Sequence, residues 1–262
     1  MNKFKGCLLF TDVDGTLANG EYINPANVEA VRRFVADGGQ VALATGRTTQ
    51  SALPVAKRLG CEDGLLIINN GTVVYDSKKQ KIVWQCSLPC RDIADTVISK
   101  FPQIGALLYC GTDVVALSPN SQIDALVRSE RLTLTEKSKY DVNKILFSGT
   151  PDVLNDVYDY INSLADSGCT AVRSDDIYVE ALPKSVDKGY AARMLSNMLS
   201  IDKSKIFAAG NYYNDISLME LAAVSCAPCE SPDEVKRHAD YIACPCRDGA
   251  VADFIEYLYK TQ

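Results

Sequence analysis

The sequence predicts an α/β protein in which a doubly wound parallel sheet carries a second α/β module as an insertion. Short apolar runs alternate with segments of helical periodicity over residues 7–68, the pattern of a parallel sheet covered by helices on both faces. The alternation resumes after Pro183. The stretch between residue 68 and Pro183 instead has the pattern of hairpins and separate helices. With 262 residues, the chain is long enough for one large or two modest domains.

The first predicted strand, residues 7–11, leads directly into Asp12 and Asp14. Ligands of open α/β sheets lie beyond the carboxyl ends of the strands, so both carboxylates arrive where chemistry is expected. Alternate side chains of an extended segment share a face, and two negative charges on one face repel each other without a cation or a shared proton. The pair therefore predicts a site for a hard divalent metal such as Mg²⁺. The alternative is a helix-capping aspartate in an ordinary turn.

The remaining elements of the first part follow from apolar periodicity and from the Asn, Pro and Gly residues at their ends. In order they are a helix from Asn24-Pro25 to Gly38, a strand over 40–44, a helix to about Leu59, a strand over 65–68 and a hairpin over 72–84.

The inserted stretch combines two predicted helices, 91–100 and 152–167, with strand-like runs over 105–110, 113–117, 144–148, 170–174 and 177–181. We therefore expect a core domain of residues 1–85 and 184–262 and a cap domain of residues 86–183. The last part returns to the parallel pattern and completes a Rossmann-like core. Its predicted elements are a helix over 188–199, a strand over 206–209, a helix over 216–222, strands over 224–226 and 241–243 around a helix over 232–238, and a closing helix over 250–259.

Composition narrows the classes of partner. The net charge of −6 and the pI of about 4.9 argue against nucleic acid as the main partner, because a phosphate backbone requires a surface rich in Lys and Arg. They leave small phosphorylated substrates open. His238 is the single histidine, which disfavours Ser-His or Cys-His catalysis. No apolar stretch is long enough to cross a bilayer and no signal-type region follows the first residues, so we expect no membrane partner and a cytoplasmic location.

Four polar clusters lie at the carboxyl ends of predicted core strands or at the start of a helix beside them. They are Asp12 and Asp14, Thr45-Gly46-Arg47, Lys188, and the group Asn211, Asn214 and Asp215. Each cluster alone is a weak signal, since a Thr-Gly-Arg turn is usually only a turn. Their common level in the predicted sheet indicates one site.

These clusters resemble the four motifs of the haloacid dehalogenase superfamily. The resemblance rests on Asp12-Val13-Asp14-Gly15-Thr16, Thr45-Gly46, Lys188-Gly189 and Gly210-Asn211-Tyr212-Tyr213-Asn214-Asp215, in that order. Asn70-Gly71, Asp248-Gly249-Ala250-Val251 and the place of the insertion between the second and third motifs resemble the Cof-type sugar-phosphatase branch. The resemblance covers the core; for the cap it rests on position and size.

The resemblance implies a Mg²⁺-dependent phosphatase that hydrolyses a small phosphorylated metabolite, a sugar phosphate or a phosphorylated cofactor, through an aspartyl-phosphate. It implies that Asp12 is the nucleophile, that Asp14 is the general acid and base, and that Lys188 offsets the negative charge of Asp12 and the phosphate. Phosphate would be bound by Thr45, Gly46, Arg47 and Asn214, and Mg²⁺ by Asp12, the main-chain carbonyl of Asp14, Asn211 and Asp215. For Arg47 an ion pair with a surface carboxylate is an equally good interpretation.

Asn211 departs from the family pattern, which usually has an aspartate at that position. An amide oxygen can ligate Mg²⁺ but brings no charge, so we expect weaker metal binding or a larger share for Asp215. The departure keeps a non-catalytic phosphometabolite-binding protein as an alternative to the enzyme. A phosphomutase, which would transfer the phosphoryl group to a second position of the sugar, is the other alternative.

Two close cysteine pairs, Cys226 with Cys229 and Cys244 with Cys246, resemble a zinc site in number. A pair with a single intervening residue is unusual for zinc. Reduced loop cysteines are therefore the favoured interpretation, with a zinc site as the alternative.

Overall fold

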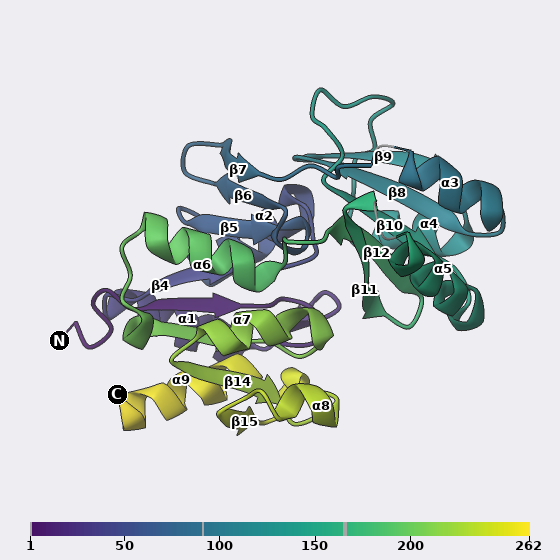
Figure 1. The fold of residues 1–262 in the computed structure, drawn as a ribbon. Helices are drawn as coiled ribbons and strands as arrows, with labels where there is room; N and C mark the ends of the chain where they lie inside the picture. The colour runs from purple at the N-terminus through teal and green to yellow at the C-terminus, as the bar shows by residue number, and fades with distance from the viewer. Residues whose placement is uncertain (1, 91, 165–166) are drawn as a thin grey trace.

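The computed structural model describes residues 2–90, 92–164 and 167–262. Its core holds a parallel sheet whose strands lie in the order β15-β14-β13-β1-β4 (Figure 1). These strands are β15 (Tyr241–Ala243), β14 (Val224–Pro228), β13 (Ile206–Ala209), β1 (Leu8–Thr11) and β4 (Gln40–Leu43). A parallel bridge between Ala44 and Ile67 brings β5 (Leu65–Ile68) beside β4, and β5 continues into the antiparallel strands β6 (Val73–Asp76) and β7 (Lys81–Gln85).

Helices cover both faces of this sheet because the side chains of its central strand alternate between two hydrophobic cores. Leu9 of β1 packs with the face covered by α1, α2 and α9, whereas Leu8 and Phe10 pack with the face covered by α6 and α7. The helices are α1 (Pro25–Ala36), α2 (Thr49–Leu59), α6 (Lys188–Met198), α7 (Ile216–Leu221), the short α8 (Asp233–Lys236) and α9 (Ala250–Thr261).

Local capping explains where the helices near the site begin. Asn24 Oδ1 accepts from the Ala26 amide at 2.9 Å and Pro25 occupies the first turn of α1. Asp187 Oδ1 accepts from the Tyr190 amide at 2.7 Å. This cap fixes the first turn of α6, in which Lys188 lies.

The inserted stretch forms a second, antiparallel sheet, here called the cap sheet, in the order β11-β12-β10-β8-β9. Its strands are β8 (Gly105–Cys110), β9 (Asp113–Ser118), β10 (Lys144–Ser148), β11 (Cys169–Asp175) and β12 (Tyr178–Pro183). Helices α3 (Ile93–Lys100) and α5 (Pro151–Ser163) cover one face around a separate hydrophobic core. Part of the other face carries α4 (Ser121–Ser129), and the rest looks toward the carboxyl ends of the core strands (Figure 1).

Several predicted boundaries in the insertion need correction. Helix α3 begins at Ile93 rather than at residue 91, which lies outside the described residues, as do residues 165–166 of the predicted helix 152–167. Helix α5 ends at Ser163 because Leu164 leaves the helical region with ψ near 74°. Helix α4 was not predicted, since Ile123 is its one fully buried residue and leaves little apolar period. The small hairpin of β2 (Ala18–Asn19) and β3 (Tyr22–Ile23) was also missed.

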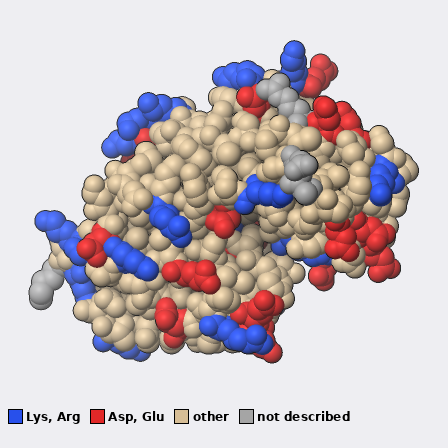
Figure 2. Space-filling view, in the orientation of Figure 1, with Lys and Arg blue, Asp and Glu red and all other residues tan. Residues whose placement is uncertain are grey.

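The visible face of the molecule carries charges of both signs. Lys and Arg side chains there are interspersed with Asp and Glu rather than gathered into a basic stripe (Figure 2). Of the helices in the described part of the chain, none combines the length and the apolar character that a membrane span requires.

Candidate active site

A cavity of about 1010 Å³ lies between the carboxyl ends of the core strands and the cap sheet. Asp12, Asp14 and Lys188 line it from the core, whereas Lys144 and Glu180 line it from the cap sheet. The structure thus brings all four predicted clusters to one place, as their common level in the sheet predicts.

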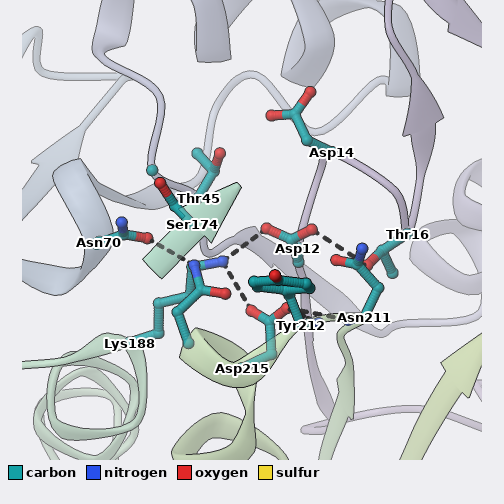
Figure 3. A network of polar contacts seen from close by, with 12 residues as sticks. Asp12, Asp14, Thr16, Thr45, Asn70, Ser174, Lys188, Asn211, Tyr212 and Asp215 are labelled. Carbon is teal, nitrogen blue, oxygen red and sulfur yellow. Dashed lines mark hydrogen bonds and ion pairs between the residues drawn. The ribbon is translucent and has the colours of Figure 1, made fainter. Parts of the chain in front are cut away.

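Lys188 joins two carboxylates at the floor of the cavity (Figure 3). Its Nζ lies 2.6 Å from Asp12 Oδ1 and 2.7 Å from Asp215 Oδ1, and the side chains of these three residues are at most 6% exposed. Asp12 comes from the end of β1, Lys188 from the first turn of α6 and Asp215 from the loop after β13. One cation therefore serves two buried carboxylates.

This shortage of positive charge shows in the pKa of Asp12. Burial raises it to about 7, and the negative charges of Asp215 and Asp14 add to the rise, whereas Lys188 opposes it. The same two carboxylates raise the pKa of Lys188 despite its burial, so the ammonium stays charged. A further cation near Asp12 would restore the balance.

Groups that could ligate such a cation lie together beside the second oxygen of Asp12. The side-chain amide of Asn211, with its nitrogen facing these acceptors, lies 3.2 Å from Asp12 Oδ2 and 3.0 Å from the main-chain oxygen of Asp14. Turning that amide over would direct its oxygen to the same point, which would then be faced by a carboxylate, a carbonyl and an amide oxygen. This set suits Mg²⁺. Gly15 leaves room for it, since a Cβ there would lie 2.2 Å from the Asn211 amide.

Asp215, the other predicted metal ligand, has both oxygens engaged by protein donors. Oδ1 accepts from Lys188, and Oδ2 accepts from the main-chain amides of Asn211 at 2.9 Å and Tyr212 at 3.1 Å. The carboxylate thus fixes the loop that carries Asn211 and holds Lys188 from below. Direct ligation of a metal by Asp215 stays a prediction that this arrangement does not favour.

Arg47 binds Asp14 in a bidentate ion pair across the cavity. Its Nε lies 2.8 Å from Asp14 Oδ2 and its Nη2 lies 2.6 Å from Oδ1. The Asp14 side chain is 54% exposed and points away from Asp12 (Figure 3). The sequence left two interpretations of Arg47, phosphate binding and an ion pair with a surface carboxylate. The structure shows an ion pair, and its partner is Asp14, the residue predicted to act as general acid.

The residues predicted to bind phosphate lie around the side chain of Asn70. Asn70 Oδ1 accepts from Asn214 Nδ2 at 3.1 Å, and its Nδ2 donates to Glu180 of the cap sheet. A Cβ on Gly46 would lie 3.2 Å from the Asn70 amide, so the Thr45-Gly46 turn packs closely on it. The Thr45 hydroxyl is buried and accepts from the Arg47 amide at 3.1 Å.

Sequence reasoning missed Lys144 and Glu180. Both are charged residues within predicted strands. A charged side chain in a strand at the centre of a sheet is often buried, and buried charges are rare unless they are paired. That conflict with the strand pattern was the available signal.

The possible zinc site does not form. Within residues 2–90, 92–164 and 167–262, no three His, Cys, Asp or Glu side chains are arranged to hold a metal ion, and Cys226, Cys229, Cys244 and Cys246 are free. The zinc alternative is therefore wrong, although β14 and β15 are indeed neighbours.

Comparison with known proteins identifies the family. A sequence model of the haloacid dehalogenase-like hydrolases matches residues 9–255. The chain belongs to this family. The resemblance drawn from the four motifs, including its Cof-type branch, is confirmed, as is the α/β fold with a parallel central sheet.

Relatives of this hydrolase include named phosphatases. The 5-amino-6-(5-phospho-D-ribitylamino)uracil phosphatase YwtE of Bacillus subtilis is 28% identical over 283 residues, which cover 96% of this chain and 97% of the relative. The solved structure of the subclass IIB sugar phosphatase BT4131 superposes with a TM-score of 0.83 at 18% identity and covers 97% of this chain and 99% of its own. The expected class of enzyme, a phosphatase of the haloacid dehalogenase type, is thereby confirmed.

A third relative is longer. The chloroplastic endoribonuclease YBEY of Arabidopsis thaliana is 26% identical over 278 residues, and the alignment covers 98% of this chain but 47% of that protein. The chain thus spans about half the length of this relative.

Proposed function

We propose that this phosphatase hydrolyses a small phosphate monoester, a sugar phosphate or a phosphorylated cofactor, with Mg²⁺ and through an aspartyl-phosphate on Asp12. The observation that carries the proposal is the buried Asp12–Lys188–Asp215 chain at the floor of a cavity that Asp14 also lines. The relatives support the substrate class, because one acts on a phosphorylated ribitylaminouracil and another is a sugar phosphatase.

Asp12 is the proposed nucleophile. Its carboxylate attacks phosphorus, the bond from phosphorus to the leaving oxygen breaks, and an aspartyl-phosphate forms. Lys188 stays charged and offsets the negative charge that collects between Asp12 and the phosphate. Thr16, which donates to Asp12 Oδ2 at 3.1 Å, keeps the carboxylate oriented.

Asp14 is the proposed general acid and then the general base. It gives a proton to the leaving oxygen, takes a proton from the water that attacks the aspartyl-phosphate, and so returns Asp12 to its free form. In this structure both oxygens of Asp14 are bound to Arg47, so the carboxylate would leave that ion pair and turn toward Asp12 for each proton transfer. Thr45, Gly46, Arg47 and Asn214 are the proposed phosphate-binding residues.

Asp12, the Asp14 carbonyl and Asn211 would hold Mg²⁺. The ion would supply positive charge that lets the anionic carboxylate approach the anionic phosphate. Asp215 would act by fixing Lys188 and the Asn211 loop. We place the substrate-selecting cap at residues 86–183 and the catalytic core at residues 1–85 and 184–262.

The deciding test is phosphate release from p-nitrophenyl phosphate and from a panel of sugar phosphates and phosphorylated cofactors. Wild type with Mg²⁺ should turn over, and both chelation and Asp12→Asn should lower the rate by about 10³-fold or more. Asp233→Asn, a change at an exposed aspartate paired with Lys236, is the matched control and should keep the wild-type rate. Release of phosphate that survives Asp12→Asn would contradict the mechanism.

Asn211 is the one feature that favours the second candidate, a non-catalytic binding protein. That candidate predicts binding of inorganic phosphate by folded wild type without turnover of any panel member. Conversion of a sugar phosphate into its isomer, without release of phosphate, would instead identify a phosphomutase.

A further inference from the structure

A buried ion pair lies on the side of the cap sheet that faces the core. Lys144 Nζ of β10 lies 3.1 Å from Glu180 Oε1 of β12, and the two side chains are 1% and 3% exposed. The ring of Tyr109, the residue paired with Lys144 on β8, lies 4.0 Å from the ammonium. Removing two charges from water is costly and must be offset by further hydrogen bonds.

Those further hydrogen bonds cross from the cap sheet to the core. Lys144 Nζ donates to the main-chain oxygen of Gly46 at 2.8 Å. Glu180 Oε2 accepts from Asn70 Nδ2, while its Oε1 also accepts from Ser174 at 3.0 Å. Gly46 belongs to the proposed phosphate-binding turn.

Asn70 extends the link from Glu180 to a second phosphate-binding residue. Its side-chain oxygen accepts from Asn214 Nδ2, so Asn70 joins Glu180 to Asn214. One ion pair of the cap sheet thus reaches two separate loops of the core that are proposed to bind phosphate. If the cap sheet moves away, Gly46 loses Lys144, and Asn70, which holds Asn214, loses Glu180.

Another ion pair between cap and core is exposed and is not linked to the proposed phosphate-binding residues. Arg131 and Glu21 form an ion pair at 3.2 Å, but their side chains are 80% and 71% exposed. Water and salt screen such a pair, which therefore contributes little. Both residues line the cavity, so this pair is no control for phosphate binding. Lys236 and Asp233 of α8 form an ion pair at 2.8 Å outside the cavity lining and serve as the control.

We propose that Lys144 and Glu180 are positioning residues that hold Gly46 and Asn214 in their phosphate-binding arrangement when cap and core meet. The assignment rests on the proposed function for the identity of the phosphate-binding residues. Because binding and closure then share the same hydrogen bonds, bound phosphate favours closure as much as closure favours phosphate binding.

The test measures the Kd of inorganic phosphate by calorimetry at saturating Mg²⁺. The double variant Lys144→Met/Glu180→Met removes both charges and keeps a similar side-chain volume, so it should stay folded. Its melting temperature should fall somewhat, because Asn70 Nδ2 and the Gly46 oxygen lose their partners. We expect its Kd to rise about tenfold, within the range usual for coupling between sites. A structural role confined to cap folding would alter the melting temperature and leave the Kd of the folded double variant unchanged.

Lys236→Met should leave the Kd within about twofold of wild type, as expected for a change remote from the link and from the cavity. A Kd within about twofold of wild type in the double variant would overturn the proposal. If that variant does not fold, Asn70→Gly cuts the Glu180–Asn214 branch of the link from the core side and must also raise the Kd by more than about twofold. Wild type that binds no phosphate would also overturn it, whereas binding without turnover would defeat only the proposed function.

Discussion

Lys188 Nζ contacts the carboxylates of Asp12 and Asp215, so one positive charge serves two negative ones in a buried site. The pKa of Asp12 is raised chiefly by burial, and the negative charges of Asp215 and Asp14 add to the rise that Lys188 opposes. Asn211 adds no charge to this group. In a chain with aspartate at that position, the repulsion would be larger without metal and the attraction for Mg²⁺ stronger.

We therefore expect Asn211→Asp to keep phosphatase activity and to lower the Mg²⁺ concentration needed for half-maximal rate. The added carboxylate would face Asp12 Oδ2 and the Asp14 carbonyl, where the amide now lies. The measurement is a Mg²⁺ titration of p-nitrophenyl phosphate hydrolysis for both proteins. Superimposable titrations would remove Asn211 from the proposed ligands.

The loop after β5 orients side chains of the candidate site through its backbone conformation. Asn69, Asn70 and Gly71 are consecutive residues with positive φ, at 53°, 57° and 96°. Asn tolerates this left-handed region better than most residues, and Gly enters it without cost. The turn aims Asn70 at Glu180 and Asn214 and lets Gly71 lie against the start of α6, next to Lys188.

Gly71→Ala should destabilise the protein by about 3 kcal/mol or more, the sum of left-handed strain and overpacking. A Cβ there would lie 2.2 Å from the main-chain oxygen of Asp187 and would push the first turn of α6. We also expect loss of activity, because Lys188 lies in that turn.

Gly60→Ala is the control for this change. Gly60 also has a positive φ, 75°, but a Cβ there meets only the Arg32 side chain, at 3.5 Å. It should cost about 1–2 kcal/mol and leave activity intact. Urea unfolding of both variants supplies the comparison. Equal losses of stability would show that the contact between the Asn70 loop and α6 is not tightly packed.

At the scale of the whole molecule, polar contacts join cap and core around the cavity, and among the described residues each part has buried hydrophobic clusters of its own. The cap sheet and its helices α3 and α5 have a hydrophobic cluster of their own. Polar interfaces of this kind permit relative motion of two domains. Closure would exclude water from the aspartyl-phosphate until Asp14 activates one molecule.

We expect Mg²⁺ with orthovanadate, a phosphate analogue, to reduce the radius of gyration of the protein in solution. Bound anion would favour the closed arrangement through Gly46 and Asn214, the proposed phosphate-binding residues that Lys144 contacts directly and Glu180 reaches through Asn70. Small-angle scattering with and without these ligands measures the change, and chelator in place of Mg²⁺ is the control. Identical profiles would count against domain closure.

The sequence by itself determined the core strands, the order of the four motifs and their meeting at one edge of the sheet. These follow from local causes: apolar runs form buried strands, Asn24 caps the first helix, and parallel strands present their carboxyl ends together. Asp12, Asp14, Lys188 and Asn211 accordingly lie where the motifs placed them.

Only the tertiary structure decided how those residues share their charges. Lys144 contacts Gly46 across 98 positions of sequence, and Lys188 contacts Asp12 across 176. Strand register and the packing of the cap on the core set such contacts, and no local pattern encodes them. For that reason the sequence could neither predict the contact of Asp215 with Lys188 nor place the Lys144–Glu180 pair over the loops proposed to bind phosphate.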